Sequence, residues 1–114
     1  MRDNLGNKPR LQHIYEAILE IESYIKDYDY EEFKSNSMMH YASVKQLEII
    51  GEAANHITPE FKKLYPEIPW REIVGLRNIL IHEYFGIDTK IVWDIITTDI
   101  FIFKPKIKAI IDQI

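Results

Sequence analysis

Arg77, His82 and Tyr84 lie close together in the stretch RNILIHEY, among aliphatic residues. Arginine stays charged, and its planar guanidinium matches a phosphate group bidentately. Histidine, with an unperturbed pKa of about 6.5, can accept or donate a proton near neutral pH. Chemistry at a phosphodiester needs a proton acceptor, a proton donor and a cation for the phosphate oxygens. Arg77 and His82 could supply these groups, while Asn78 could orient the histidine or bind a ribose hydroxyl.

A purely structural role would also account for these residues. An arginine at a helix–helix contact usually pairs with a carboxylate, and Glu52 or Glu72 could serve Arg77. A histidine near a helix C-terminus is favourable through the helix dipole alone. Tyr84 could close the helix end with its ring packed on a neighbouring side chain. Because the Arg-x4-His spacing is degenerate, the pattern by itself favours this structural interpretation.

The composition indicates one folded domain spanning residues 1–114. The chain has no cysteine, which excludes disulfides and thiolate metal sites. Its first residues, MRDNLGNKPR, lack the apolar region of a signal peptide. The apolar runs are too short to cross a bilayer. We therefore expect a cytoplasmic protein that does not enter the membrane.

The charge balance limits the kinds of partner. The chain has 14 basic and 18 acidic residues, and its formal net charge is −4. Nucleic-acid-binding proteins usually carry a basic face, because neutralising phosphates drives their affinity. The acidic balance disfavours a general nucleic-acid binder. Any RNA contact must therefore depend on one or two well-placed cations.

Apolar residues recur at intervals of three and four, which predicts an all-α antiparallel helical bundle with four to five main helices. In the first helix this stripe comprises Leu11, Ile14, Ile18, Ile21 and Ile25, with Pro9 in the first turn. A second helix should run from about Ser37 to Ile57. Its small residues Gly51 to Ala54 would let a neighbouring backbone come close.

Cap residues and prolines divide the remainder of the chain. Thr58 and Asp88 are expected to cap helices at their N-termini. A third main helix should begin near Trp70, run through the motif and stop at Phe85-Gly86, since glycine commonly follows a helix end. Pro105 interrupts the apolar spacing of the last segment, so we expect a kink or a break there.

The motif helix carries more apolar surface than one core requires. On a continuous helix, Tyr84 lies nearly above Arg77, two turns further on. Val74 and Ile81 then form an apolar strip separate from the residues that face the core. A partner helix is the simplest cover for this strip, and a second copy of the chain about a two-fold axis would provide one. We therefore expect a homodimer in which both motifs share one cleft.

The motif Arg77-Asn78-x3-His82-x-Tyr84 follows IGEAANHI and PEIPWREIVGLRN and precedes FGID and IVWDI. In this context it resembles the HEPN superfamily, and within it the HepT-like toxin branch, over almost the whole chain. The resemblance implies an all-α dimeric endoribonuclease that uses no metal or cofactor, with Arg77 and His82 catalytic and Asn78 supporting. It also implies a minimal nucleotidyltransferase antitoxin that silences the toxin by transferring AMP to Tyr84.

Two classes of function stay open. The preferred one is a metal-independent ribonuclease toxin neutralised by its partner. The alternative is a non-catalytic helical adaptor, or substrate-binding partner, whose Arg/His/Tyr face docks the nucleotidyltransferase or a nucleotide. The other histidines, His13, His40 and His56, are scattered along the chain. Glu52 and His56 are expected to form a surface or interface pair.

Overall fold

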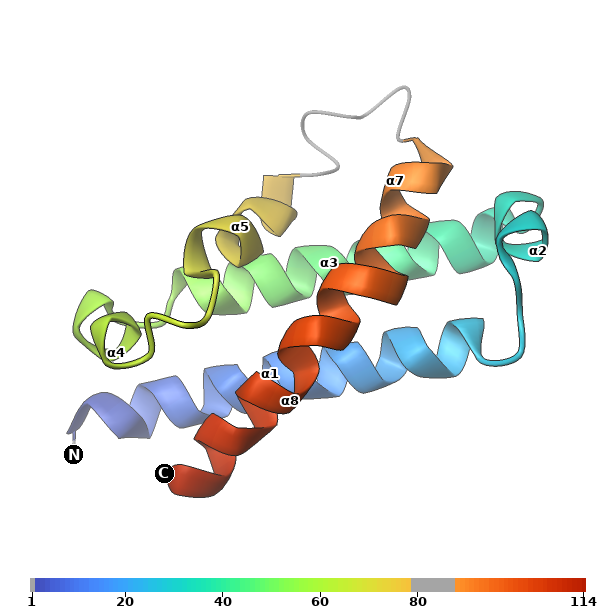
Figure 1. The fold of residues 1–114 in the computed structure, drawn as a ribbon. Helices are drawn as coiled ribbons and strands as arrows, with labels where there is room; N and C mark the ends of the chain where they lie inside the picture. Colours follow the sequence, from blue (N-terminus) through green and yellow to red (C-terminus); the bar gives the residue numbers. More distant parts are fainter. Residues whose placement is uncertain (1, 79–87) are drawn as a thin grey trace.

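The helical spacing of apolar residues is confirmed over residues 2–78 and 88–114, which the computed structural model describes. Two long helices, α1 (Arg2–Ile25) and α3 (Ser37–Asn55), lie side by side and run antiparallel (Figure 1). The short helix α2 (Tyr30–Lys34) connects them at one end. The fold is an all-α helical bundle, as the sequence predicts.

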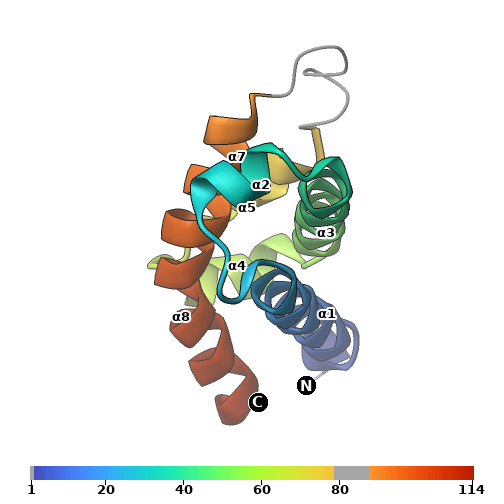
Figure 2. The same ribbon diagram turned by 90° about the vertical axis from the view of Figure 1, so that its right-hand side faces the viewer.

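A third long segment crosses α1 and α3 obliquely. It comprises α7 (Thr89–Asp94), a π-helical turn η2 (Ile95–Asp99) and α8 (Ile100–Gln113). When α1 and α3 are viewed end-on, this segment lies along one side of the pair (Figure 2). The π-helical turn has a local cause: the Thr97 hydroxyl donates to the carbonyl of Trp93 at 2.6 Å and competes with the helical ladder for that acceptor.

The three long segments meet in one apolar core. Burial of a large aliphatic side chain contributes about 1.5–3 kcal/mol, so this core is the main source of stability. Its buried residues come from α1 (Leu11, Ile14, Ile18, Ile21), α3 (Val44, Leu47, Ile50, Ala54) and α8 (Ile100, Phe103, Ile107, Ile110).

Both predicted N-caps are confirmed. Thr58 Oγ1 accepts from the amide of Phe61 at the start of α4 (Pro59–Leu64), and Asp88 Oδ1 accepts from the amide of Lys90 in α7. Thr58 also anchors α1, because the Asn7 amide group donates to its hydroxyl at 3.2 Å and accepts from its backbone N–H at 3.1 Å. Asn7 is only 1% exposed, so this reciprocal pair joins the first helix to α4 inside the protein.

The expected place of Pro9 is wrong, and so is a break at Pro105, while the kink expected there as the other possibility stays a prediction. Pro9 lies inside α1 rather than in its first turn, and α8 continues through Pro105. Both prolines are exposed. The backbone carbonyl that each leaves unpaired therefore faces the solvent side of its helix, where water can satisfy it.

Candidate active site

Arg77 is positioned by a helix that ends early. After Pro69, α5 (Trp70–Gly75) is followed by the 3-10 turn η1 (Leu76–Asn78). The expected single helix from Trp70 through the motif is therefore wrong over η1. The amide of Leu76 bonds to the carbonyls of both Ile73 and Val74, which tightens the chain just after Gly75, a residue of low helix propensity.

The turn η1 packs directly against α3 at Gly51. A Cβ atom built on Gly51 would lie 2.3 Å from the backbone nitrogen of Arg77 and 3.0 Å from its Cα. Only glycine allows this approach without moving the backbone. The expectation that small residues in α3 admit a neighbouring backbone is confirmed at Gly51, and the neighbour is the motif arginine itself.

The Arg77 side chain contacts one of its two predicted carboxylate partners. Its Nη1 lies 3.7 Å from Glu52 Oε2, while Glu52 Oε1 lies 2.9 Å from His56 Nε2. The Arg77–Glu52 separation is too long for a hydrogen bond. Among the described residues, the buried Nε of Arg77 also has no hydrogen-bond partner. Among the described residues, the guanidinium therefore makes no hydrogen bond to Glu52, and its partly exposed Nη groups can reach a ligand.

Arg77 and Glu52 line a surface hollow of about 270 Å³ together with Lys45, Glu48 and Ile49. The Arg77 side chain is 36% exposed at this hollow. The site thus presents a cation that is fixed through its backbone and open to solvent through its side chain. Such an arrangement suits binding of a phosphate oxygen.

A second hollow adjoins the first and shares Ile49 and Glu52 with it. His13 from α1 and His56 from α3 both line this second hollow. These two histidines are distant in sequence but are brought to one surface by the antiparallel pairing of α1 and α3. The Glu52–His56 pair is exposed, as predicted for a surface pair.

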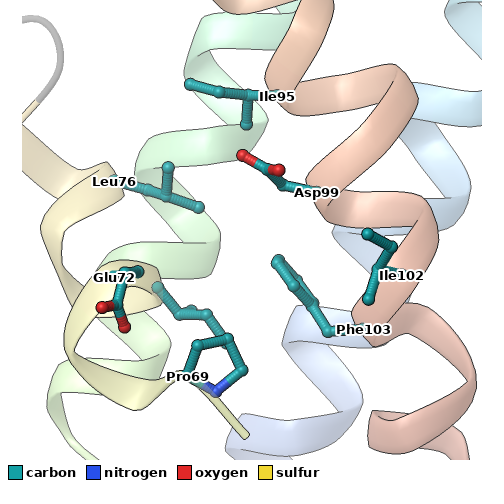
Figure 3. A pocket seen from close by; sticks show the side chains of 8 residues that line it. Pro69, Glu72, Leu76, Ile95, Asp99, Ile102 and Phe103 are labelled. Atoms are coloured by element: carbon teal, nitrogen blue, oxygen red, sulfur yellow. The ribbon is translucent and has the colours of Figure 1, made fainter.

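A more enclosed hollow between α5 and the η2–α8 segment has a different character. Aliphatic and aromatic side chains dominate its lining, with the carboxylates of Glu72 and Asp99 beside them (Figure 3). The side chains of this lining are Pro69, Glu72, Ile73, Leu76, Ile95, Asp99, Ile102 and Phe103. This lining has two carboxylates and, unlike the hollow at Arg77, no lysine or arginine to offset them, so it would repel a phosphate.

The remaining predicted site residues fall at the edge of the described structure or beyond it. Asn78 ends η1 and is partly exposed. His82 and Tyr84 lie outside the described residues, as does Ile81 of the predicted apolar strip. Their roles, and the role of Asn78, stay predictions.

Two further properties apply to the described part of the chain. It holds no cluster of three or more histidine and acidic side chains placed to bind a metal ion. None of its helices combines the length and the apolar character needed to span a membrane.

An all-α bundle with a motif arginine at a surface hollow defines a fold and a candidate anion site, but it does not define one reaction. Comparison with known families is more specific. Residues 14–114 match the family described as "Ribonuclease HepT-like", and the chain belongs to this family.

Named relatives agree with this family. The chain is 48% identical to "Putative RNase MJ1380" of Methanocaldococcus jannaschii over 89% of each chain. It is 40% identical to "Probable ribonuclease HepT" of Thermococcus cleftensis over 92% of this chain and 96% of that one. No solved structure matches the chain significantly.

Proposed function

We propose that this protein is a metal-independent endoribonuclease and the toxin of a toxin–antitoxin pair, with Arg77 and His82 as its catalytic residues. The observation that carries the proposal is the setting of Arg77 in a chain of the HepT-like family. Its backbone packs against Gly51, and its guanidinium lines a solvent-open hollow, where it makes a loose contact with Glu52. The names of the relatives support the same activity.

The proposed reaction needs no external nucleophile. The ribose 2′-OH attacks the adjacent phosphorus, its proton passes to a base, and the P–O5′ bond breaks as the leaving oxygen takes up a proton. The products are a 2′,3′-cyclic phosphate and a 5′-OH end. His82 performs a proton transfer, and Arg77 binds the phosphate oxygens whose negative charge grows in the transition state.

Arg77→Ala and His82→Ala should each abolish RNA cleavage and growth inhibition while leaving the helical fold intact. Arg71→Ala is the matched control, because Arg71 is an exposed arginine of α5 that does not line the hollow. Cleavage by the wild-type protein should persist in EDTA and leave a 2′,3′-cyclic phosphate. Undiminished cleavage by both alanine variants would exclude the catalytic assignment and favour the adaptor function.

The proposal includes regulation by a minimal nucleotidyltransferase encoded beside this protein. The tyrosine hydroxyl would attack the α-phosphate of ATP, forming a Tyr84–AMP phosphodiester and releasing pyrophosphate. The added AMP would bring a negative phosphate that Arg77 can bind in place of RNA. Intact-mass spectrometry after co-expression should show AMP on Tyr84 and none on Tyr84→Phe. An unmodified protein that is nonetheless neutralised would support occlusion of the site by the partner instead.

The active form is proposed to be a cytoplasmic homodimer. Val74, next to Gly75 at the end of α5, is a partly buried apolar residue of the predicted strip. A two-fold contact through Val74 and Ile81 would bring the two motifs to one cleft and give RNA cations from both chains.

A further inference from the structure

The exposed face of α3 extends from the surface around Arg77 toward the N-terminal end of this helix. Tyr41, Lys45, Glu48 and Glu52 are spaced by four, three and four residues, so they share one helix face that extends for roughly 16 Å. Arg77 contacts this face at Glu52. A ligand bound to Arg77 can therefore extend along α3 past Lys45 to Tyr41.

Lys45 is the second cation of the hollow that contains Arg77. Its side chain is exposed, and within the described residues it forms no ion pair, whereas Lys90, Lys104 and Lys108 each have a carboxylate partner. Of the two carboxylates in the hollow, Glu52 is already engaged by His56, and among the described side chains Glu48 forms no ion pair with Lys45. Lys45 is thus free to bind an anionic group that enters the hollow.

Tyr41 provides an aromatic surface one helical turn beyond Lys45. It is 60% exposed, and its ring is held edge-to-face against His40 with centroids 4.8 Å apart. His40 is itself buried and contacts the ring of Phe33, so the ring of Tyr41 packs on one side against a buried aromatic pair. The exposed remainder of the ring suits stacking by a nucleobase.

The charges around the hollow of Arg77 are nearly balanced, so RNA binding there would need stacking as well as phosphate contacts. Lys45 and Arg77 are balanced by the carboxylates of Glu48 and Glu52, and the whole chain has a net charge of −4. Phosphate attraction alone would therefore give limited affinity. A base on Tyr41 adds binding energy that does not depend on the net charge.

We propose that this face of α3 binds the nucleotide next to the scissile phosphate of single-stranded RNA. Lys45 contacts its phosphate, and Tyr41 stacks on its base. The inference rests on the proposed ribonuclease function, and it assigns a substrate-binding site outside the Arg-x4-His motif. Stacking tolerates all four bases, so the site contributes affinity more than sequence specificity.

A single-stranded 2′-O-methyl RNA oligonucleotide is a suitable probe, because it has no 2′-OH to attack and binds without being cleaved. Its dissociation constant would be measured by fluorescence anisotropy at several salt concentrations. Lys45→Ala should weaken binding and reduce the magnitude of the salt slope by about 0.7, the value for one phosphate contact on a single strand. Tyr41→Ala should weaken binding about tenfold and leave the salt slope unchanged.

Two matched variants control the experiment. Tyr41→Phe keeps the ring and should bind as the wild type does. Lys106→Ala removes an exposed lysine of α8 and should change neither affinity nor salt slope.

If Lys45→Ala and Tyr41→Ala bind the probe like the wild type while the wild type cleaves RNA, the α3 contact is overturned and the ribonuclease function stands. If only one variant is weakened, the contact belongs to that residue and the two-residue site is overturned. If the wild type neither binds the probe nor cleaves RNA, both the site and the proposed function are overturned.

Discussion

At the scale of single residues, the carboxylate of Glu52 acts on Arg77 in two opposite ways. The Glu52 carboxylate, 3.7 Å from Nη1, limits the orientations of the guanidinium. The same carboxylate would repel a phosphate that binds Arg77. The first effect favours catalysis, because an oriented cation stabilises the transition state. The second weakens binding of the substrate in its ground state.

Glu52→Gln should therefore separate the two kinetic constants. Removing the negative charge should lower KM by about twofold to fivefold, the range expected for an exposed ion pair, while kcat falls because Arg77 is less constrained. Glu48→Gln, in the same hollow, removes a carboxylate that is not paired with Arg77 and should leave kcat unchanged. Steady-state cleavage kinetics would check both variants. A wild-type kcat for Glu52→Gln would show that Glu52 does not position Arg77.

His40 gives a pH dependence to stability. Burial lowers the pKa of His40 from its ordinary 6.5, so the unfolded chain binds a proton more readily than the folded one. Above the pKa that His40 has in the unfolded chain, this histidine does not reduce the free energy of unfolding. As the pH falls below that pKa, the free energy of unfolding declines. Chemical denaturation at about pH 7.5 and about pH 5.5 should show a smaller decline for His40→Phe than for the wild type.

His13→Gln provides the comparison for this measurement, because His13 is exposed. The decline in stability of the His13→Gln variant between the two pH values should equal that of the wild type. Equal declines for the wild type and His40→Phe would mean that another group causes the loss of stability at acidic pH.

At the scale of secondary-structure elements, the contact between α3 and η1 connects stability to the site. Gly51→Ala places a methyl group against the backbone of Arg77, where neither element can yield without a shift. We expect a loss of about 1–3 kcal/mol in unfolding free energy and a displaced Arg77 with reduced cleavage. Differential scanning calorimetry and an RNA cleavage assay would measure the two effects.

Gly75 supplies the matched substitution for this prediction. Among the described residues, a Cβ on Gly75 meets nothing within 4 Å, and the φ of Gly75 is not positive. Gly75→Ala should therefore stabilise the protein by about 0.5–1 kcal/mol through reduced chain entropy. If Gly51→Ala were as stable as Gly75→Ala, the close packing of η1 on α3 would be refuted.

Features that depend on residues close together in the chain, such as the apolar stripes and the N-caps, were predictable from the sequence. Core stripes depend on apolar spacing, and caps depend on a side chain within three residues of the amide that it binds, as at Thr58 and Asp88. The continuity of α1 at Pro9 and of α8 at Pro105 was not predicted, because a proline's effect on a helix depends on whether water reaches the carbonyl that it leaves unpaired. Solvent exposure is a property of the assembled bundle.

The candidate site was only partly predictable for the same reason. From the sequence, either Glu52 or Glu72 could pair with Arg77, and in the folded protein Arg77 contacts Glu52. The low helix propensity of Gly75, where α5 ends, was visible in the sequence, but the approach of η1 to Gly51 was not. His13 and His56 line one hollow because α1 and α3 pair, and this pairing is not visible in the sequence. The spacing of Tyr41 and Lys45 on α3 was visible in the sequence, but the place of Lys45 in the hollow of Arg77 was not.

At the scale of the whole molecule, exposed apolar residues occur on more than one side of the bundle. Phe101 and Ile102 of α8 are 70% and 55% exposed. The proposed two-fold contact, in contrast, uses Val74 beside the motif. The choice between these surfaces decides whether two motifs can share one cleft, because only the surface at Val74 lies next to Arg77 in sequence and structure.

Sedimentation velocity should distinguish the two surfaces. We expect the wild-type protein to be a dimer, and Val74→Glu or Ile81→Glu to give monomers, since each would place an unpaired carboxylate in the contact. Phe101→Glu alters an exposed apolar residue of α8 and should remain dimeric. Circular dichroism of each variant separates dissociation from unfolding. Cleavage should be lost with the dimer, because the composite cleft needs cations from both chains. A folded monomer with full activity would show that a single chain holds the complete site.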